Sequence, residues 1–195
     1  MTADDERVAH SARAADLIAD LIADRSTVAT AESITGGRLV AALTSVAGSS
    51  AVVRGSVVAY ADEVKTSMLG VDPRILAEEG AVSSAVAEQM ASGARDRLGA
   101  TYGVATTGEA GPSSGSGRPV GTVFVAVAAP TAVWCRRLDA WGDRAQIQQA
   151  AVEGALRMLA EVRAGGARTA GVSTEVPTRE QRRPTARSGD TYPQG

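Results

Sequence analysis

One stretch decides the fold class of this chain: residues 27–46, which read TVATAESITGGRLVAALTSV. Residues 27–31 are β-prone, Glu32 to Gly37 form a turn of small residues, and residues 38–46 return apolar side chains at helical spacing. The stretch therefore predicts a strand, a turn and a helix in direct succession. This succession is the building unit of α/β proteins, in which helices connect the strands of a sheet.

The alternation continues on both sides of this stretch. Apolar residues recur at helical spacing across residues 8–25: Val8, Ala15, Ile18, Leu21 and Ile22. Further along we expect strands at residues 55–61 and 102–107, a hairpin at residues 122–129 and 132–138, and helices at residues 62–69, from 72, 83–98 and 143–162. The sequence predicts a single-domain α/β protein, a three-layer αβα sandwich with a largely parallel sheet that the hairpin makes mixed.

Length and composition fit one domain with polar ends. A chain of 195 residues with 44% hydrophobic and 22% charged residues can bury one sizeable core. We expect a flexible N-terminus at residues 1–7, the folded domain at residues 8–162 and a disordered tail at residues 163–195. In that tail Gly, Arg, Thr, Ser and Pro replace the apolar periodicity.

Charge and hydropathy argue against several function classes. The formal net charge is -2 and aromatic residues are 3% of the chain, and the globular part shows no basic patch, so nucleic acid is not an expected partner. No apolar run approaches the ~18 residues of a membrane span, and residues 1–7 lack the order of a signal peptide. The single cysteine, Cys135, and the single histidine, His10, cannot build a metal cluster. We expect a cytoplasmic protein with no membrane partner, no metal and no cofactor.

Ser33 lies where a nucleophile would be useful. Backbone N–H groups at the start of a helix point outward, so they stabilise an anion or a developing oxyanion. Ser33, Thr35, Gly36 and Gly37 have this arrangement between the expected strand and helix. Serine and threonine are also common helix caps, and paired glycines are common in turns, so a purely structural role is the alternative.

Lys65 is the candidate base. The position of His10, on the first helix, argues against a Ser-His-Asp triad. The chain has 20 lysines and arginines in total, and Lys65 is the only lysine. Arginine cannot be deprotonated at physiological pH, whereas a desolvated lysine can. Tyr60, at the end of an expected strand, could orient either side chain or relay a proton. A lysine retained by accident and a tyrosine that caps a core strand are the alternatives.

Two further segments could contact a ligand. The glycine-rich residues 108–112 follow an expected strand end, the side of an α/β sheet on which ligands bind. Arg144 begins the last helix, where Asp143 can cap and Arg144 can reach a phosphate. A plain turn and an ordinary surface arginine are the alternatives.

Together these segments resemble the CinA C-terminal domain family, whose stand-alone members include nicotinamide-nucleotide amidohydrolases. The similarity runs from about residue 15 to residue 159. It rests on six motifs in order: TAESITGG at 30–37, VAYADEVK at 58–65, GAVS at 80–83, TGEAGP at 107–112, PVGTV at 119–123 and GDR at 142–144.

The resemblance implies an amidase that hydrolyses the carboxamide of nicotinamide mononucleotide to nicotinic acid mononucleotide and ammonia. Carried over by position, Ser33 attacks the amide carbon, Lys65 takes its proton and Tyr60 supports the pair, and water releases an acyl-enzyme. The implied substrate-binding residues are Thr35, Gly36, Gly37, Thr107, Gly108, Gly111 and Arg144. Since family members are commonly dimers or larger, the resemblance also implies a homo-oligomer.

Three residues depart from the family pattern. The family often has cysteine in place of Ile34, asparagine in place of Asp62 and an apolar residue in place of Glu109, and the loop at residues 112–119 is one residue short. A carboxylate near a phosphate would repel it unless it points to solvent. A non-catalytic nucleotide-binding or interaction module of the competence and DNA-damage type is the alternative function, and an amidase for another small carboxamide is a third.

Overall fold

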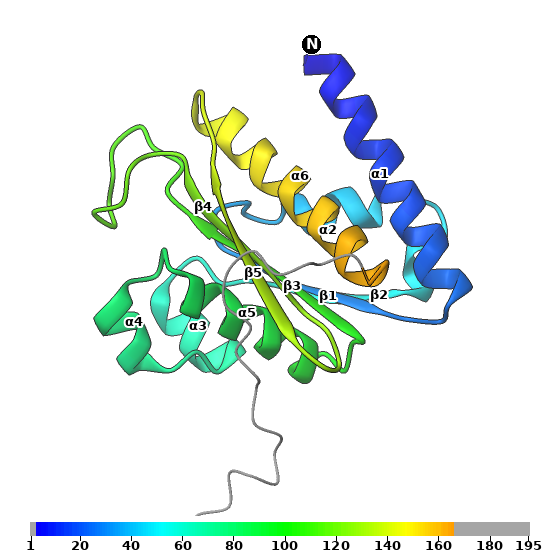
Figure 1. The fold of residues 1–195 in the computed structure, drawn as a ribbon, viewed down its shortest axis with the longest axis horizontal. Coiled ribbons are helices and arrows are strands. Elements are labelled where there is room, and N and C mark those ends of the chain that lie inside the picture. The colour runs from blue at the N-terminus through cyan, green and yellow to red at the C-terminus, as the bar shows by residue number, and fades with distance from the viewer. Residues whose placement is uncertain (1–2, 166–195) are drawn as a thin grey trace, which may run out of the picture.

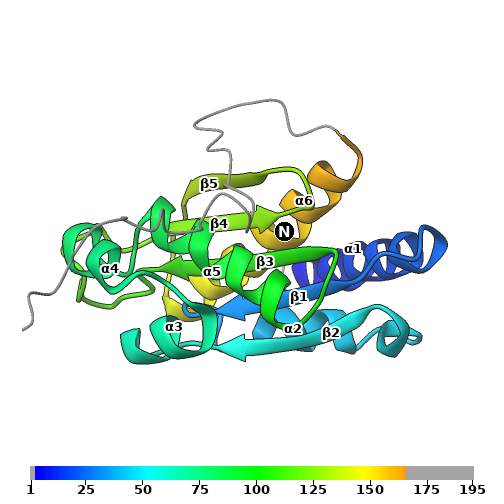
Figure 2. The ribbon, with the colours of Figure 1, turned by 90° about the horizontal axis from the view of Figure 1, so that it is seen from below.

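The computed structural model describes the backbone of residues 3–165 and the side chains of residues 12–165. It forms three layers, a five-stranded sheet between two layers of helices (Figures 1 and 2). The strands are β1 (Val28–Glu32), β2 (Val53–Val58), β3 (Tyr102–Gly108), β4 (Thr122–Ala128) and β5 (Val133–Asp139). The helices are α1 (Ala3–Ala23), α2 (Arg38–Thr44), α3 (Asp62–Leu69), α4 (Pro73–Glu79), α5 (Ser84–Arg97) and α6 (Arg144–Arg163), with a short 3-10 helix η1 (Ser49–Ala51).

The strands lie in the order β2-β1-β3-β4-β5. β1 pairs in parallel with both β2 and β3, whereas β4 is antiparallel to β3 and β5 is antiparallel to β4. Within residues 3–165, β4 is therefore the strand that runs against the other four. The predicted three-layer sandwich with a mixed, largely parallel sheet is confirmed, including the hairpin of β4 and β5.

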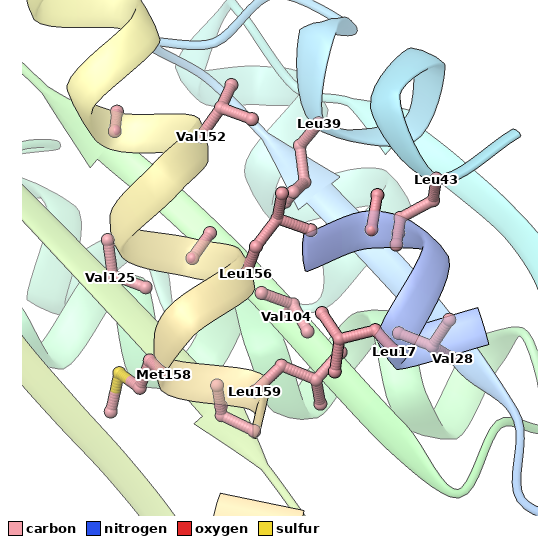
Figure 3. Close-up of a cluster of buried hydrophobic side chains, with 14 of the residues drawn as sticks. Leu17, Val28, Leu39, Leu43, Val104, Val125, Val152, Leu156, Met158 and Leu159 are labelled. Atoms are coloured by element: carbon pink, nitrogen blue, oxygen red, sulfur yellow. The ribbon is translucent and has the colours of Figure 1, made fainter. Parts of the chain in front are cut away.

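The two faces of the sheet are built from different side chains. One face presents valines to α1, α2 and α6, where leucines complete the core (Figure 3): Val28, Val104, Val123, Val125 and Val127 against Leu17, Leu39, Leu43, Leu156 and Leu159. The other face presents alanines to α3 and α5: Ala29, Ala31, Ala105, Ala126 and Ala128 against Leu69, Val86 and Met90. Since side chains alternate along a strand, a Val-Ala alternation in the sequence separates the two cores.

The alanine face allows α5 to approach the sheet closely. A Cβ atom on Gly103 of β3 would overlap the carbonyl oxygen of Ala91, and one on Gly93 of α5 would overlap the carbonyl oxygen of Leu69. Glycine is thus required at both positions for reasons of space. The backbone of α5 consequently contacts both β3 and α3 directly.

The ends of the domain differ from the expected boundaries. Helix α1 begins at Ala3, so residues 3–7, expected to be flexible, lie in its first turns. Helix α6 ends at Arg163, whose guanidinium donates to Asp20 and Asp24 at 2.9 and 2.6 Å, so this residue belongs to the domain and not to the tail. The ion pairs hold the end of α6 against the end of α1. Residues 166–195 of the expected tail lie outside the described residues.

Strand β2 ends at Val58, three residues before the expected end. The Ala59 amide still donates to the Glu32 carbonyl oxygen at 2.8 Å, but the chain then turns into α3, whose first turn carries Asp62 and Glu63. Acidic side chains favour a helix start, because they complement the helix dipole. Tyr60 therefore lies in the connection between β2 and α3, with its side chain 63% exposed.

Candidate functional site

Three parallel strands end side by side and bring the expected site residues to one edge of the sheet. In the register of these strands, Glu32 is the partner of both Val58 and Thr106. The Ser33 amide then donates to the Thr106 carbonyl oxygen at 2.9 Å. Ser33 and Tyr60 thus follow the ends of β1 and β2, and Thr107 lies near the end of the neighbouring β3, at the edge on which ligands bind in parallel sheets.

The turn that carries Ser33 depends on two glycines. Gly36 and Gly37 have φ angles of 58° and 96°, in the left-handed region that side chains disfavour. The Gly36 amide donates to the Ser33 carbonyl oxygen at 3.3 Å, which closes the turn. The Ser33 side chain is half-buried at the start of this turn.

Sequence reasoning missed Glu32, whose carboxylate fills the start of α2. Glu32 is fully buried, and its Oε2 accepts hydrogen bonds from the Gly37 amide at 2.9 Å and the Leu39 amide at 3.0 Å, while its Oε1 accepts from the Val40 amide at 2.8 Å. The Thr35 hydroxyl also donates to Oε2, at 2.7 Å. A glutamate directly before a turn that opens a helix is the signal that could have identified this contact.

Two groups that we expected to bind a ligand have a partner inside the protein instead. The Gly37 amide and the Thr35 hydroxyl both donate to the Glu32 carboxylate, so the amides of α2 are not the oxyanion donors of this turn. Within residues 3–165, the amides of Ile34 and Thr35 donate no hydrogen bond. These two amides directly follow Ser33, as an oxyanion site for a serine nucleophile requires.

Lys65 is buried on α3, with 1% of its side chain exposed. Its Nζ donates to the Asp62 carboxylate at 3.0 Å and to the Tyr60 carbonyl oxygen at 3.2 Å. The side chain therefore runs back to the start of α3 and to the segment that follows β2. The partners of Nζ among the described residues are thus Tyr60 and Asp62, and not Ser33.

Arg144 connects three segments above this edge. It begins α6, where the Asp143 side chain accepts from the Gln146 amide and the Gln146 side chain accepts from the Asp143 amide in a capping box. One guanidinium nitrogen donates to the Tyr60 hydroxyl and another to the Gly111 carbonyl oxygen, both at 2.9 Å. The structure therefore brings together Tyr60, Gly111 and Arg144, three of the residues expected in the site.

The remaining expected residues shape the wall of the site. The Thr107 hydroxyl is buried and donates to the Ala81 carbonyl oxygen at 2.7 Å. At Gly108 a Cβ would lie 2.8 Å from the Ile34 side chain, so glycine lets the end of β3 contact the Ser33 turn. These residues hold the strand end in place within the described structure.

Glu109 turns into its own loop. Its Oε2 accepts from the Ser116 and Gly115 amides at 3.0 Å each and from the Ser116 hydroxyl at 2.8 Å. Burial raises the pKa of this carboxyl, but the hydrogen bonds from Ser116 and Gly115, with the nearby charge of Arg144, outweigh it and hold the pKa below its ordinary value. The glutamate that stands here in place of the family's apolar residue thus makes hydrogen bonds that order the loop.

Among the side chains of residues 12–165, no three from His, Cys, Asp or Glu gather as a metal site requires. No helix within residues 3–165 combines the length and apolarity of a membrane span.

Comparison with known proteins identifies a family. A family model described as the CinA C-terminal domain matches residues 10–163. A CinA-like protein of Frankia casuarinae is 51% identical over 150 residues, which are 76% of this chain and 35% of that protein. One of Mycolicibacterium gilvum is 46% identical over 153 residues, 77% of this chain and 36% of that protein. The chain therefore spans about a third of the length of these curated relatives.

Solved structures match over most of their own length. The competence/damage inducible protein CihA of Agrobacterium tumefaciens is 42% identical, with a TM-score of 0.76, over 79% of this chain and 95% of that one. The CinA superfamily protein ECK1530/EC0983 of Escherichia coli is 32% identical, with a TM-score of 0.77, over 83% of this chain and 94% of that one. The similarity thus covers about four fifths of this chain and nearly all of each of those two structures.

Proposed function

This chain belongs to the CinA C-terminal domain family, and on that premise we propose that it is an amidohydrolase that deamidates nicotinamide mononucleotide. The products are nicotinic acid mononucleotide and ammonia. In this proposal Ser33 is the nucleophile, Lys65 the base and Tyr60 the residue that supports them.

The burial of Lys65 is the observation that carries the proposal. Lysine normally keeps its charged end in water, and burial of an ammonium group costs free energy. Here the only lysine of the chain is 1% exposed and lies at the edge of the sheet that carries Ser33. A buried lysine can supply a neutral amine, which arginine cannot do, so the position suits a base.

The proposed reaction uses these residues in turn. Lys65 removes the Ser33 proton as the serine oxygen attacks the carboxamide carbon, and the amides of Ile34 and Thr35 stabilise the oxyanion. The protonated Lys65 then gives its proton to the departing ammonia, and water releases the acyl group from Ser33. Because Nζ donates to the Asp62 carboxylate at 3.0 Å, this contact must open before Nζ can take the Ser33 proton, and the 56% exposed side chain of Asp62 is free to turn to solvent.

Arg144 is the proposed contact for the substrate phosphate. Its guanidinium donates one hydrogen bond to Tyr60 and one to Gly111, and the Arg144 residue is exposed. Guanidinium has five N–H donors, so further donors remain for an anion. The hydrogen bond of Arg144 to the Tyr60 hydroxyl supports a site in which the phosphate end of the substrate lies next to the proposed catalytic residues.

A non-catalytic nucleotide-binding module is the second candidate function. The hydrogen bond of Nζ to Asp62, in place of a bond to Ser33, favours it, because a base must contact the proton that it takes. Such a protein would bind the mononucleotide through Arg144 without hydrolysing it.

Ammonia release from nicotinamide mononucleotide by the purified chain tests the proposal. We expect release by the unaltered protein, loss in Ser33→Ala, and retention in Ser67→Ala, a matched change at an exposed serine of α3. Free nicotinamide, which lacks the phosphate, is expected to be a poorer substrate. Binding of the mononucleotide without ammonia release would overturn the proposal in favour of the binding module.

A further inference from the structure

Glu32 is a buried carboxylate that the proposed reaction does not use. Burial of a carboxylate costs free energy unless hydrogen bonds replace those of water. Glu32 is 0% exposed, and six donors surround it. Oε2 accepts from the Thr35 hydroxyl and the Gly37 and Leu39 amides, and Oε1 accepts from the Val40 amide at 2.8 Å, the Thr30 hydroxyl at 3.3 Å and the Ser56 hydroxyl at 3.4 Å.

We propose that Glu32 is a positioning residue, whose carboxylate holds the backbone of the Ser33 turn in the one shape that presents the serine hydroxyl for attack. This inference rests on the proposed role of Ser33 as a nucleophile. Glu32 acts through the turn and touches no reacting atom.

The donors come from every segment around Ser33. Thr30 lies on β1 before it, Ser56 lies on the neighbouring β2, and Thr35 lies in the turn after it. The Thr35 hydroxyl also shares a 2.8 Å hydrogen bond with the Thr106 hydroxyl of β3. Because the Ser33 amide is bound to the Thr106 carbonyl oxygen, Ser33 is held between β3 on one side and the Glu32 carboxylate on the other.

The same contacts decide where an anion can bind. Amides at a helix start normally attract phosphate or carboxylate groups of a ligand. Here Glu32 already occupies the amides of Gly37, Leu39 and Val40, so a substrate phosphate is excluded from the start of α2. The unbonded amides of Ile34 and Thr35 are left for the reacting oxygen, and Arg144 is left for the phosphate.

The variant Glu32→Gln tests the positioning role, because it keeps the side-chain shape and replaces one acceptor oxygen by a donor. The reactivity of Ser33 is measured with a fluorophosphonate, whose phosphorus the serine oxygen attacks with loss of fluoride, and the adduct is detected by intact mass. We expect the labelling rate to fall at least tenfold. We also expect faster hydrogen exchange at the amides of Gly37, Leu39 and Val40, with no comparable change in α5.

A second pair of variants decides the matter if Glu32→Gln does not fold. Thr35→Val removes one donor to the carboxylate at nearly constant volume, and Thr44→Val is the matched change at an exposed threonine of α2. We expect Thr35→Val to label several-fold more slowly and Thr44→Val to label at the rate of the unaltered protein. The positioning role is overturned if Thr35→Val labels as fast as Thr44→Val, or if a folded Glu32→Gln labels as fast as the unaltered protein.

The labelling readout separates this inference from the proposed function. If the unaltered protein labels at Ser33 and Glu32→Gln slows labelling, the positioning role holds even where nicotinamide mononucleotide yields no ammonia. In that case only the proposed substrate fails. If Ser33 of the unaltered protein resists the probe, Glu32 has no reactive serine to position and the inference is wrong.

Discussion

Arg144 donates a hydrogen bond of 2.9 Å to the phenolic oxygen of Tyr60, which joins the first turn of α6 to the segment after β2. The two residues are 84 positions apart in the chain. The Tyr60 carbonyl oxygen at the same time accepts from Lys65. Tyr60 therefore contacts the proposed base, Lys65, through its backbone, and through its side chain it contacts Arg144, the residue proposed to bind the substrate phosphate.

Arg144→Ala is expected to raise KM for the mononucleotide more than it lowers kcat. A phosphate contact that is equal in the ground state and the transition state affects binding alone. A charged hydrogen bond contributes about 1.5–3 kcal/mol, so KM should rise roughly 10- to 100-fold. Steady-state ammonia release measures both constants, with Arg137→Ala on β5 as the control at an exposed arginine. An unchanged KM would remove Arg144 from the site.

Lys65→Arg is expected to lose about 10³ in kcat while the protein still folds. The change keeps the positive charge and most of the bulk but removes any accessible neutral form. The matched control is Arg54→Lys, the reverse exchange at an exposed position of β2, which should leave kcat unchanged. Ammonia release and thermal melting are measured for both variants. An active Lys65→Arg enzyme would exclude lysine as the base.

Asp62→Asn is expected to raise kcat. The Asp62 carboxylate holds Nζ at 3.0 Å in an ion pair, whereas a neutral amide holds it less tightly, so the contact opens more readily in the variant. Steady-state ammonia release measures kcat, and Asp139→Asn serves as the control at an exposed aspartate. An unchanged kcat would show that opening of this ion pair does not limit the reaction.

Glu109→Gln is expected to speed hydrogen exchange at the Gly115 and Ser116 amides. Since the folded state holds the pKa of Glu109 below its ordinary value, its contribution to stability is complete above about pH 4.5 and is lost as pH falls through the lower, folded pKa. The difference in exchange between the two proteins should therefore be present at pH 7 and shrink in acid. Identical exchange at pH 7 would show that the carboxylate does not hold this loop.

A chain that ends at Gly165 is expected to keep its melting temperature, because residues 166–195 lack apolar periodicity. One that ends at Val162 loses Arg163, whose side chain is 10% exposed and pairs with Asp20 and Asp24. An exposed ion pair contributes about 0.2–1 kcal/mol, and these two more enclosed pairs about 1–2 kcal/mol together. The shorter chain should melt several degrees lower, at roughly 2–4 °C per kcal/mol. Equal melting of the two truncated chains would contradict a role for Arg163.

The sandwich could be predicted from the sequence because local signals agree with the fold. Residues 27–46 contain a β-prone run, a turn with paired glycines and a helical pattern, and each lies where the structure has β1, the turn and α2. Strand and helix patterns of this kind depend on neighbours in the chain. The extent of α1 and the inclusion of Arg163 depend on contacts between the two ends of the domain, which no local pattern reports.

The candidate site was predictable as a set of positions but not as a set of contacts. The expected location of Ser33, Tyr60 and Arg144 at one edge follows from the direction of the strands. The use of the Glu32 carboxylate as the partner of the α2 amides could not be read from spacing, because a glutamate beside a turn is more often solvated. The ion pair of Lys65 with Asp62 likewise depends on the direction of the Lys65 side chain, which runs back to the first turn of α3.

The valine and alanine faces of the sheet set different limits on how this sequence can vary. On the valine face, long side chains from three helices meet those of the strands, and one methyl group more or less can be absorbed by neighbours that change in turn. On the alanine face the backbones are already in contact at Gly93 and Gly103, so there is no space for an added methyl group. Substitutions should therefore accumulate rapidly on the valine side of the sheet and very slowly on the alanine side.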